Sequence, residues 1–331
     1  MLVRWAAWIA AATSVALVAA LVLLSRGGGS VALPGAPEAS ASSEGPAAPE
    51  LDAGNGPIDD RPIAAPLRLR FGPDRIASPF RAPPRAGLLV DLDSGEVLWS
   101  RSPRRDLPIA SLTKIMTALL VEHRSPARDR VRITREALAY QGSGVGVLPR
   151  GKTVQLETML YGLMLPSGND AAIALAQHVW GTVSRFVDHM NAQARALGLR
   201  CTRFDSPSGF EEVRYQRQAA NRSCAADLAV LARILLDRPR LARIVRHRSV
   251  VRRFPIKGGR LELYNHNPLL KERYPGTLGI KTGYTDAAGR CLVAAVERDG
   301  RRLGVVLLHS PDPGRQAKAL LRRGFAAVGA R

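Results

Sequence analysis

Acidic residues are scarce in this chain of 331 residues. Asp and Glu number 28 against 48 Lys and Arg, which gives a formal net charge of +20. Residues 1–85 are nearly balanced, with 8 basic and 7 acidic residues, so the excess lies in residues 86–331. Such a field suits an anionic partner: nucleic acid, an anionic lipid surface or an anionic cell wall. A genomic bias toward arginine, which supplies 42 of the basic residues, is the alternative explanation.

Aromatic residues and cysteines are also few. Aromatic side chains make up 5% of the chain, and no zinc-finger spacing or aromatic-rich RNA-binding signature accompanies the charge. We therefore expect no nucleic-acid partner. Cys201, Cys224 and Cys291 form no Cys-x-x-Cys pair and lack histidines at metal-binding spacing, so no metal or other cofactor is predicted. Two interpretations of the cysteines remain: a disulfide between Cys201 and Cys224, or burial of the thiols as small apolar side chains.

The longest stretch without charge lies at the N-terminus, between Arg4 and Arg26. Residues 5–24 have the length of a helix that crosses the hydrocarbon core of a bilayer. A cleavable signal peptide usually has a shorter apolar stretch and a small-x-small site close behind it, and the nearest such site is at residues 30–32. We predict a transmembrane anchor or signal sequence at residues 5–24 after a short cytoplasmic end at residues 1–4. The chain is thus placed at the cell membrane, with the residues that follow this segment exported.

The remaining chain divides into a linker and one domain. Residues 25–85 are rich in Gly, Ala and Pro, which predicts a disordered linker before a domain at residues 86–331. Strand patterns lie at both ends of that domain, as a hairpin at 87–99 and as five segments between 250 and 309. Helical periodicity fills 111–246, and a closing helix covers 315–328. The order predicts an α+β fold: an antiparallel sheet built from both ends and flanked by helices, with an inserted helical subdomain.

Ser111 and Lys114 form a Ser-x-x-Lys motif at the predicted start of a helix. Residues three apart share a helix face, so the Lys114 amine can reach the Ser111 hydroxyl. A serine hydroxyl becomes a good nucleophile only when an adjacent base takes its proton. Burial and nearby positive charge can keep a lysine neutral enough to do so. Taken alone, such a motif more often marks a helix-capping serine followed by a surface lysine.

Two further motifs complete a chemical set. Ser167-Gly-Asn169 interrupts two apolar helical stretches, which suits either a helix cap or a hydroxyl and an amide in a cleft. Lys281-Thr-Gly283 lies in a strand pattern, where a small residue lets a peptide lie alongside as an added strand. There Lys281 and Thr282 can hold a carboxylate. The alternative is a charged edge strand that discourages aggregation.

From about Ala86 to the C-terminus the chain resembles the D-alanyl-D-alanine carboxypeptidases, which are low-molecular-mass penicillin-binding proteins. The matching stretches are 93–99, 108–117, 166–172, 205–209, 265–270 and 279–286. The resemblance implies a β-lactamase/penicillin-binding-protein-like transpeptidase fold. It also implies a serine-type carboxypeptidase that removes the terminal D-alanine from peptidoglycan stem pentapeptides through a Ser111 acyl-enzyme. β-Lactam antibiotics are expected as inhibitors.

The resemblance also assigns roles. Ser111 is expected to attack, Lys114 to accept its proton, and Ser167 to pass the proton to the leaving D-alanine. The backbone N–H groups of Ser111 and Tyr284 are expected to form the oxyanion hole. The expected substrate-binding residues are Asn169, Lys281, Thr282, Gly283, Tyr284 and Arg315.

Departures from the family pattern leave alternatives open. Many members have a histidine or another residue in place of Tyr284, and only 50 residues follow Lys281, so we expect no separate C-terminal β-domain. A D,D-endopeptidase that cuts cross-links shares the whole mechanism. A serine β-lactamase is disfavoured because no Glu-x-x-Leu-Asn element lies between Asn169 and Lys281. A wall-binding module without turnover is disfavoured by the intact motifs.

Overall fold

The computed structural model describes residues 62–78, 80–213, 216–217 and 220–329, all within one unit formed by residues 50–331. The predicted anchor at 5–24 and most of the predicted linker lie outside these residues. Within the described part of the chain, no helix combines the length and the apolar character needed to cross a membrane.

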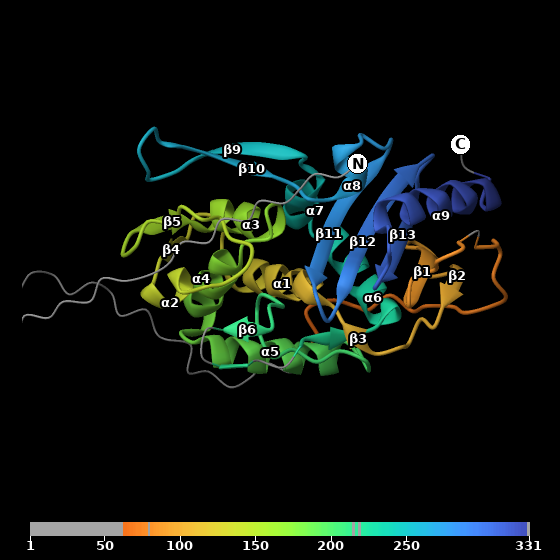
Figure 1. Cartoon of the computed structure of the whole chain (residues 1–331), viewed down its shortest axis with the longest axis horizontal. Coiled ribbons are helices and arrows are strands. Elements are labelled where there is room, and N and C mark those ends of the chain that lie inside the picture. Colours follow the sequence, from red (N-terminus) through yellow and green to blue (C-terminus); the bar gives the residue numbers. More distant parts are fainter. Residues whose placement is uncertain (1–61, 79, 214–215, 218–219, 330–331) are drawn as a thin grey trace, which may run out of the picture. The chain divides into compact units, whose positions relative to one another are not determined.

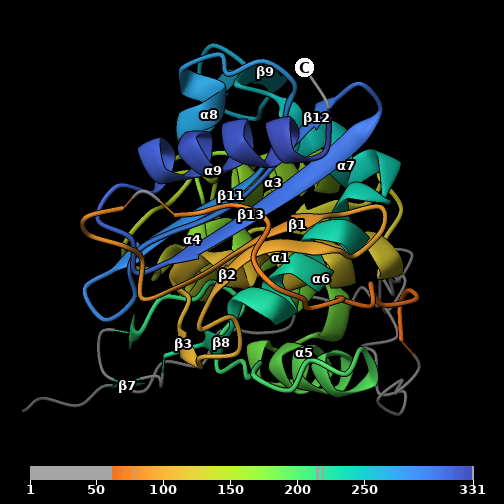
Figure 2. The same cartoon turned by 90° about the vertical axis from the view of Figure 1, so that its right-hand side faces the viewer.

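The main sheet has five antiparallel strands in the order β11-β12-β13-β1-β2. As the sequence predicts, the two ends of the domain build it together. The first strand pairs with the last one, with Ala86 opposite Leu308, and Figures 1 and 2 show these orange and blue strands side by side. The strands are β1 (Ala86–Asp91), β2 (Val97–Arg101), β11 (Thr277–Thr285), β12 (Gly289–Arg298) and β13 (Arg301–Leu308).

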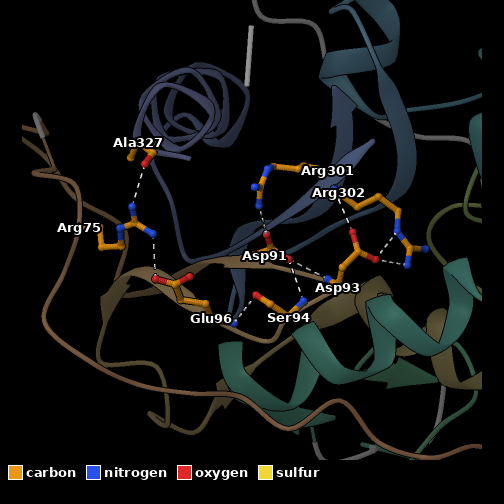
Figure 3. Close-up of polar contacts among 8 residues, drawn as sticks. All are labelled: Arg75, Asp91, Asp93, Ser94, Glu96, Arg301, Arg302 and Ala327. Carbon is orange, nitrogen blue, oxygen red and sulfur yellow. Dashed lines mark hydrogen bonds and ion pairs between the residues drawn. The ribbon is translucent and has the colours of Figure 1, made fainter. Parts of the chain in front are cut away.

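The β1–β2 turn is held by its own polar side chains. The Asp91 carboxylate accepts the backbone N–H groups of Asp93 and Ser94, both at 2.9 Å. Figure 3 shows the turn joined to β13 by an Asp93–Arg302 ion pair, with Arg301 lying 3.8 Å from Asp91. Two distant hairpins are thereby fixed to each other. The hairpin predicted at 87–99 is confirmed, with its turn at the Asp-Ser-Gly stretch 93–95.

Each face of the sheet carries its own apolar core. On one face, α9 (Pro313–Ala327) packs Leu320, Leu321 and Phe325 against Leu89 and Val305. The other face packs against α1 (Lys114–Arg124) and α6 (Ala225–Leu236) in a much larger cluster. Figure 2 shows the sheet between α9 and these two helices. The closing helix predicted at 315–328 thus covers a sheet face.

The predicted helical insertion lies between β2 and β11. Its further helices are α2 (Arg135–Leu138), α3 (Leu156–Met164), α4 (Asn169–Trp180), α5 (Val183–Ala196), α7 (Pro239–Arg246) and α8 (Pro268–Lys271). Short strand pairs join these helices, and their two or three residues are too few to show a sequence period. They are β3 (Leu107–Pro108) with β8 (Arg222–Ser223), β4 (Arg130–Arg132) with β5 (Thr153–Gln155), and β6 (Glu212–Val213) with β7 (Gln216–Arg217).

Two of the five predicted C-terminal strands do not join the main sheet. β9 (Ser249–Arg253) and β10 (Arg260–Tyr264) form a separate hairpin, visible along the upper edge of Figure 1. Leu261 and Leu263 on its inner side are buried. Apolar and polar residues therefore alternate along β10 as they do in a strand of the main sheet.

The folded region begins before Ala86. Backbone hydrogen bonds join Arg70 to Gly95 and Val97, and join Arg75 to Leu98 on the edge strand β2. Ile76 is buried in the α9 core. The segment covers a sheet edge that would otherwise expose unpaired backbone groups. Its Pro- and Arg-rich composition conceals this, because the contacts use main-chain atoms.

A disulfide links Cys201 and Cys224, whose Cα atoms lie 5.6 Å apart. Of the two interpretations left open by the sequence, the structure has the disulfide. Cys291 is a buried free thiol.

Candidate functional site

Ser111 lies on a 3₁₀ turn, Ala110–Thr113, that leads directly into α1. The prediction that it stands near a helix N-terminus is confirmed. The turn has an unusual backbone, with φ of +47° at Ala110. Gly209, at φ +77°, packs against it so closely that a Cβ there would lie 2.0 Å from the Ala110 carbonyl oxygen. The serine is therefore presented on a tightly supported turn.

Lys114 is completely buried directly behind the serine. Its Nζ lies 3.0 Å from Ser111 Oγ, 2.7 Å from Asn169 Oδ1 and 2.6 Å from the Ser208 carbonyl oxygen. These three contacts match the three hydrogens of an ammonium group, and they fix the amine in place. When the amine is neutral, its lone pair becomes available for the Ser111 proton.

Burial sets the protonation of both site lysines. It lowers the pKa of Lys114 well below 10.5, and the charge of Lys281 lowers it further, against an opposing effect of Asp170. Burial lowers the pKa of Lys281 to about 7. An amine in this environment can act as a base near neutral pH, which an exposed lysine cannot.

The second motif connects α3 to α4. Ser167 adopts a left-handed backbone, at φ +68°, and its buried Oγ has no hydrogen-bond partner among the described residues. Asn169 donates from Nδ2 to the Gln141 carbonyl oxygen at 2.6 Å. The buried Asp170 carboxylate accepts backbone N–H groups from Val145, Gly146 and Ala171 at 2.7–3.0 Å. The 141–146 loop is thereby held against the motif.

The third motif lies on β11, an edge strand of the main sheet, as predicted. The buried Lys281 donates from Nζ to the Thr282 carbonyl oxygen at 3.0 Å. A Cβ on Gly283 would lie 2.9 Å from the Ile109 carbonyl oxygen and 3.1 Å from the Ser111 nitrogen. Glycine therefore lets β11 lie directly against the serine turn, and the following residue, Tyr284, has its side chain 64% exposed.

A cleft of ≈ 420 Å³ brings the three motifs together. Ser111, Ser167, Thr282, Gly283 and Tyr284 line it, while Lys114, Asn169 and Lys281 are buried. Arg315 differs: it is exposed and is not among the residues that line the cleft. The other lining residues are Ser143, His266, Pro268, Glu272, Arg290, Cys291, Asp312, Pro313 and Gly314.

Several of these residues were not singled out by sequence reasoning. Ser143 reaches the cleft from a segment outside every matching stretch, and His266 lies in the matching stretch 265–270 but had no assigned role. Burial, with the charges of Lys281 and Lys271, lowers the pKa of His266 and so favours its neutral imidazole. The free thiol of Cys291 also lines the cleft, but burial raises its pKa to about 11, so it stays protonated at neutral pH and is a poor nucleophile.

Comparison with known proteins agrees with this geometry. Residues 76–312 match the family model of peptidase S11, described as D-alanyl-D-alanine carboxypeptidase. The chain is 35% identical over 250 residues to D-alanyl-D-alanine carboxypeptidase DacB2 of Mycobacterium tuberculosis, covering 74% of this chain and 83% of that protein. It is 33% identical over 235 residues to DacF of Bacillus subtilis, covering 69% of this chain but only 58% of the relative.

Solved structures extend the similarity to the fold. The D-alanyl-D-alanine carboxypeptidase of Mycobacterium tuberculosis H37Rv superimposes with a TM-score of 0.68 at 33% identity, covering 80% of this chain and 96% of that one. The Streptomyces K15 DD-transpeptidase superimposes with a TM-score of 0.69 at 30% identity, covering 76% and 100%. The predicted transpeptidase-type α+β fold is confirmed.

Proposed function

Because this chain belongs to the D-alanyl-D-alanine carboxypeptidase family, we propose that it removes the terminal D-alanine from peptidoglycan stem pentapeptides as a serine-type carboxypeptidase. The observation that carries the proposal is the Ser111–Lys114 pair, in which a buried amine of lowered pKa lies 3.0 Å from the hydroxyl. Nucleophilic catalysis by serine needs such a base within hydrogen-bonding reach.

In the first half of the proposed reaction, Ser111 Oγ attacks the carbonyl carbon between the two D-alanines while its proton passes to Lys114. The negative charge that develops on the carbonyl oxygen is bound by the backbone N–H groups of Ser111 and Tyr284. The close approach of Gly283 to the Ser111 nitrogen supports this pairing. Lys281 and Thr282 bind the terminal carboxylate of the substrate.

In the second half, the C–N bond breaks and a proton is delivered to the leaving D-alanine nitrogen through Ser167. Its hydroxyl lines the cleft without a partner among the described residues, so it is available for this transfer. Asn169 holds the amide of the acyl chain. Water then attacks the ester and regenerates Ser111. A β-lactam mimics the D-Ala-D-Ala end and acylates Ser111 by the same reaction steps.

The acceptor of the acyl group is a separate question from its formation. A water acceptor gives carboxypeptidase activity, whereas an amine acceptor gives transpeptidation, the reaction named for the Streptomyces K15 neighbour. A D,D-endopeptidase differs only in the leaving group that the cleft admits. All three activities share the acyl-enzyme, so products identify the function.

We test this with the complete chain and its Ser111→Ala variant, because residues 62–85 pack against the sheet. Each protein receives a pentapeptide monomer ending in D-Ala-D-Ala or a cross-linked dimer, with and without an added glycine acceptor. Mass spectrometry of the products is expected to show the monomer losing one D-alanine with the complete chain and not with the variant.

Other products would redirect the assignment. Cleavage of the dimer alone would make the protein an endopeptidase, and exchange of D-alanine for glycine without hydrolysis would make it a transpeptidase. Two intact substrates with an unlabelled Ser111 in the presence of benzylpenicillin would refute the catalytic proposal.

We further propose that residues 5–24 attach the chain to the cell membrane and place its domain on the extracytoplasmic side. The support is the length of the uncharged run in the sequence. Membranes carrying the complete chain are expected to release it only with detergent, whereas a chain without residues 1–24 should come off in high salt. Release of the complete chain by salt alone would contradict an anchor.

A further inference from the structure

The positive charge of this chain is concentrated in one segment. Residues 238–261 contain nine arginines and lysines and no aspartate or glutamate, bounded by Asp237 and Glu262. In the structure this segment forms α7 and the β9–β10 hairpin. A genomic preference for arginine over lysine does not explain why acidic residues are absent here.

Four of these cations have an ion pair or a ring contact within the fold. Arg240 and Arg243 pair with Glu157, and Arg238 lies 3.9 Å from Glu122. The Arg252 guanidinium lies over the Tyr161 ring at 4.9 Å. Five exposed cations have no ion pair in the described part of the chain, and we call them the basic arm: Arg246, Arg248, Arg253, Lys257 and Arg260.

The outward side of the hairpin brings like charges together. The strand register places Arg253 directly opposite Arg260, which is unfavourable unless an anion lies between them. Lys257 lies in the loop that joins the two strands. The inner side packs Leu261, Leu263 and Val250 against the main core, so the hairpin holds this face outward.

The same outward side also exposes apolar surface. Val251 is 45% exposed and Tyr264 is 58% exposed, two of five large apolar side chains exposed in the described residues. Alternation along β9 and β10 places them with Arg253 and Arg260, beside Glu262, which accepts the Tyr264 hydroxyl at 2.6 Å. Cations beside an exposed tyrosine and an aliphatic side chain are typical of surfaces that lie at a lipid interface. A polyanion in solution would neutralise the arginines but would not cover Val251.

We propose that the basic arm docks on the anionic headgroups of a lipid bilayer. The paired guanidinium groups of Arg253 and Arg260 bind headgroup phosphate, and Val251 and Tyr264 enter the interfacial layer. β10 continues through Asn265, which donates to the Val245 and His247 carbonyl oxygens, to His266 at the cleft. Docking the arm therefore sets the orientation of one wall of the cleft relative to the bilayer.

The test uses the complete chain with a polarity-sensitive dye on Ser249→Cys, an exposed position opposite Tyr264. The native cysteines are a disulfide pair and a buried thiol, so the dye is placed selectively. The protein is bound to nanodiscs of phosphatidylcholine alone or with one third phosphatidylglycerol. The anionic nanodiscs are expected to shift the emission to the blue, and high salt should reverse the shift.

A triple variant, Arg253→Gln, Lys257→Gln and Arg260→Gln, should bind the anionic nanodiscs roughly a hundredfold more weakly, as judged by the response of the dye. The matched control is Arg105→Gln, Arg195→Gln and Arg200→Gln, which neutralises three exposed cations and should keep the response. Arg195 lies in α5, Arg200 follows α5, and Arg105 adjoins Arg104, whose carbonyl oxygen lies 3.5 Å from Cys201 Sγ. Figures 1 and 2 show α5 on the side opposite the β9–β10 hairpin. Any effect of residues 5–24 is common to all samples. An unchanged response in the arm variant would overturn the proposal, as would an equal response to soluble polyphosphate, which would make the arm a site for polyanions in solution.

Discussion

Replacing Lys114 with alanine is expected to slow the acylation of Ser111 by benzylpenicillin about 10²–10⁴-fold, the usual contribution of a general base. The variant loses the amine 3.0 Å from Ser111 Oγ, and no other base among the described residues forms a hydrogen bond with that hydroxyl. The rate is measured by intact-protein mass spectrometry, since each acylation adds the mass of one β-lactam.

Two comparisons separate the base from a structural role. Lys114→Arg keeps a positive charge but cannot give up its proton at accessible pH, so it should acylate as slowly as the alanine variant. Thermal unfolding of each variant shows whether the fold survives the loss of the contacts to Asn169 and Ser208. Acylation of Lys114→Arg within about tenfold of the parent rate would exclude Lys114 as the base.

The pH dependence of peptide hydrolysis should reflect both buried lysines. Lys114 acts as a base when neutral, so kcat/KM should fall as pH drops through its lowered pKa. Lys281 binds carboxylate when charged, so kcat/KM should also fall as pH rises through about 7. A bound carboxylate raises the pKa of Lys281. The decrease of kcat at alkaline pH should therefore occur at a higher pH than the decrease of kcat/KM. If kcat and kcat/KM decreased at the same alkaline pH, Lys281 would not be binding the substrate carboxylate.

Replacing Gly209 with alanine is expected to destabilise the protein by about 3 kcal/mol or more, in the range of severe packing conflicts. A Cβ at this position would lie 2.0 Å from the Ala110 carbonyl oxygen, which is backbone and cannot turn away. The two loops must separate, and the Ser208 carbonyl oxygen next to Gly209 then loses its contact with Lys114. Both the free energy of unfolding in denaturant and the acylation rate should fall.

Gly198→Ala is the matched control. Gly198 has a similar backbone, with φ of +70° against +77° at Gly209. A Cβ at Gly198, however, would contact no atom within 4 Å other than those of its chain neighbours. Only the strain of an alanine in the left-handed region is therefore expected to destabilise this variant. That cost is about 1 kcal/mol, with no effect on acylation. Equal losses of stability in the two variants would show that the contact between Gly209 and the serine turn does not matter.

Sequence reasoning succeeded where the determining contacts are local. The three-residue spacing of Ser111 and Lys114 places them on one helix face, and the Asp-Ser-Gly turn pairs β1 with β2. It failed where strand alternation had two explanations. β9 and β10 form a hairpin of their own that buries Leu261 and Leu263 in the larger core cluster, and alternation does not reveal which sheet a strand joins.

Within the site, the motifs identified the groups but not their supports. The Ser208 and Gln141 carbonyl oxygens that hold Lys114 and Asn169 belong to the main chain, so residue types give no signal for them. Ser143 reaches the cleft because Asp170 holds its loop, a contact across 25 residues of sequence. Arg315 was expected from family position alone, and its exposed side chain is not part of the cleft lining.

The pairing of β1 with β13 has a consequence for the synthesis of the molecule. β1 ends at Asp91, and its partner Leu303 is synthesised more than two hundred residues later. During translation, the β1 edge of the first hairpin therefore stays unpaired while the helical insertion is synthesised. A nascent chain stopped before β13 lacks the centre of its sheet. Ser111 and Lys281 consequently come together only after nearly all of the chain has been made.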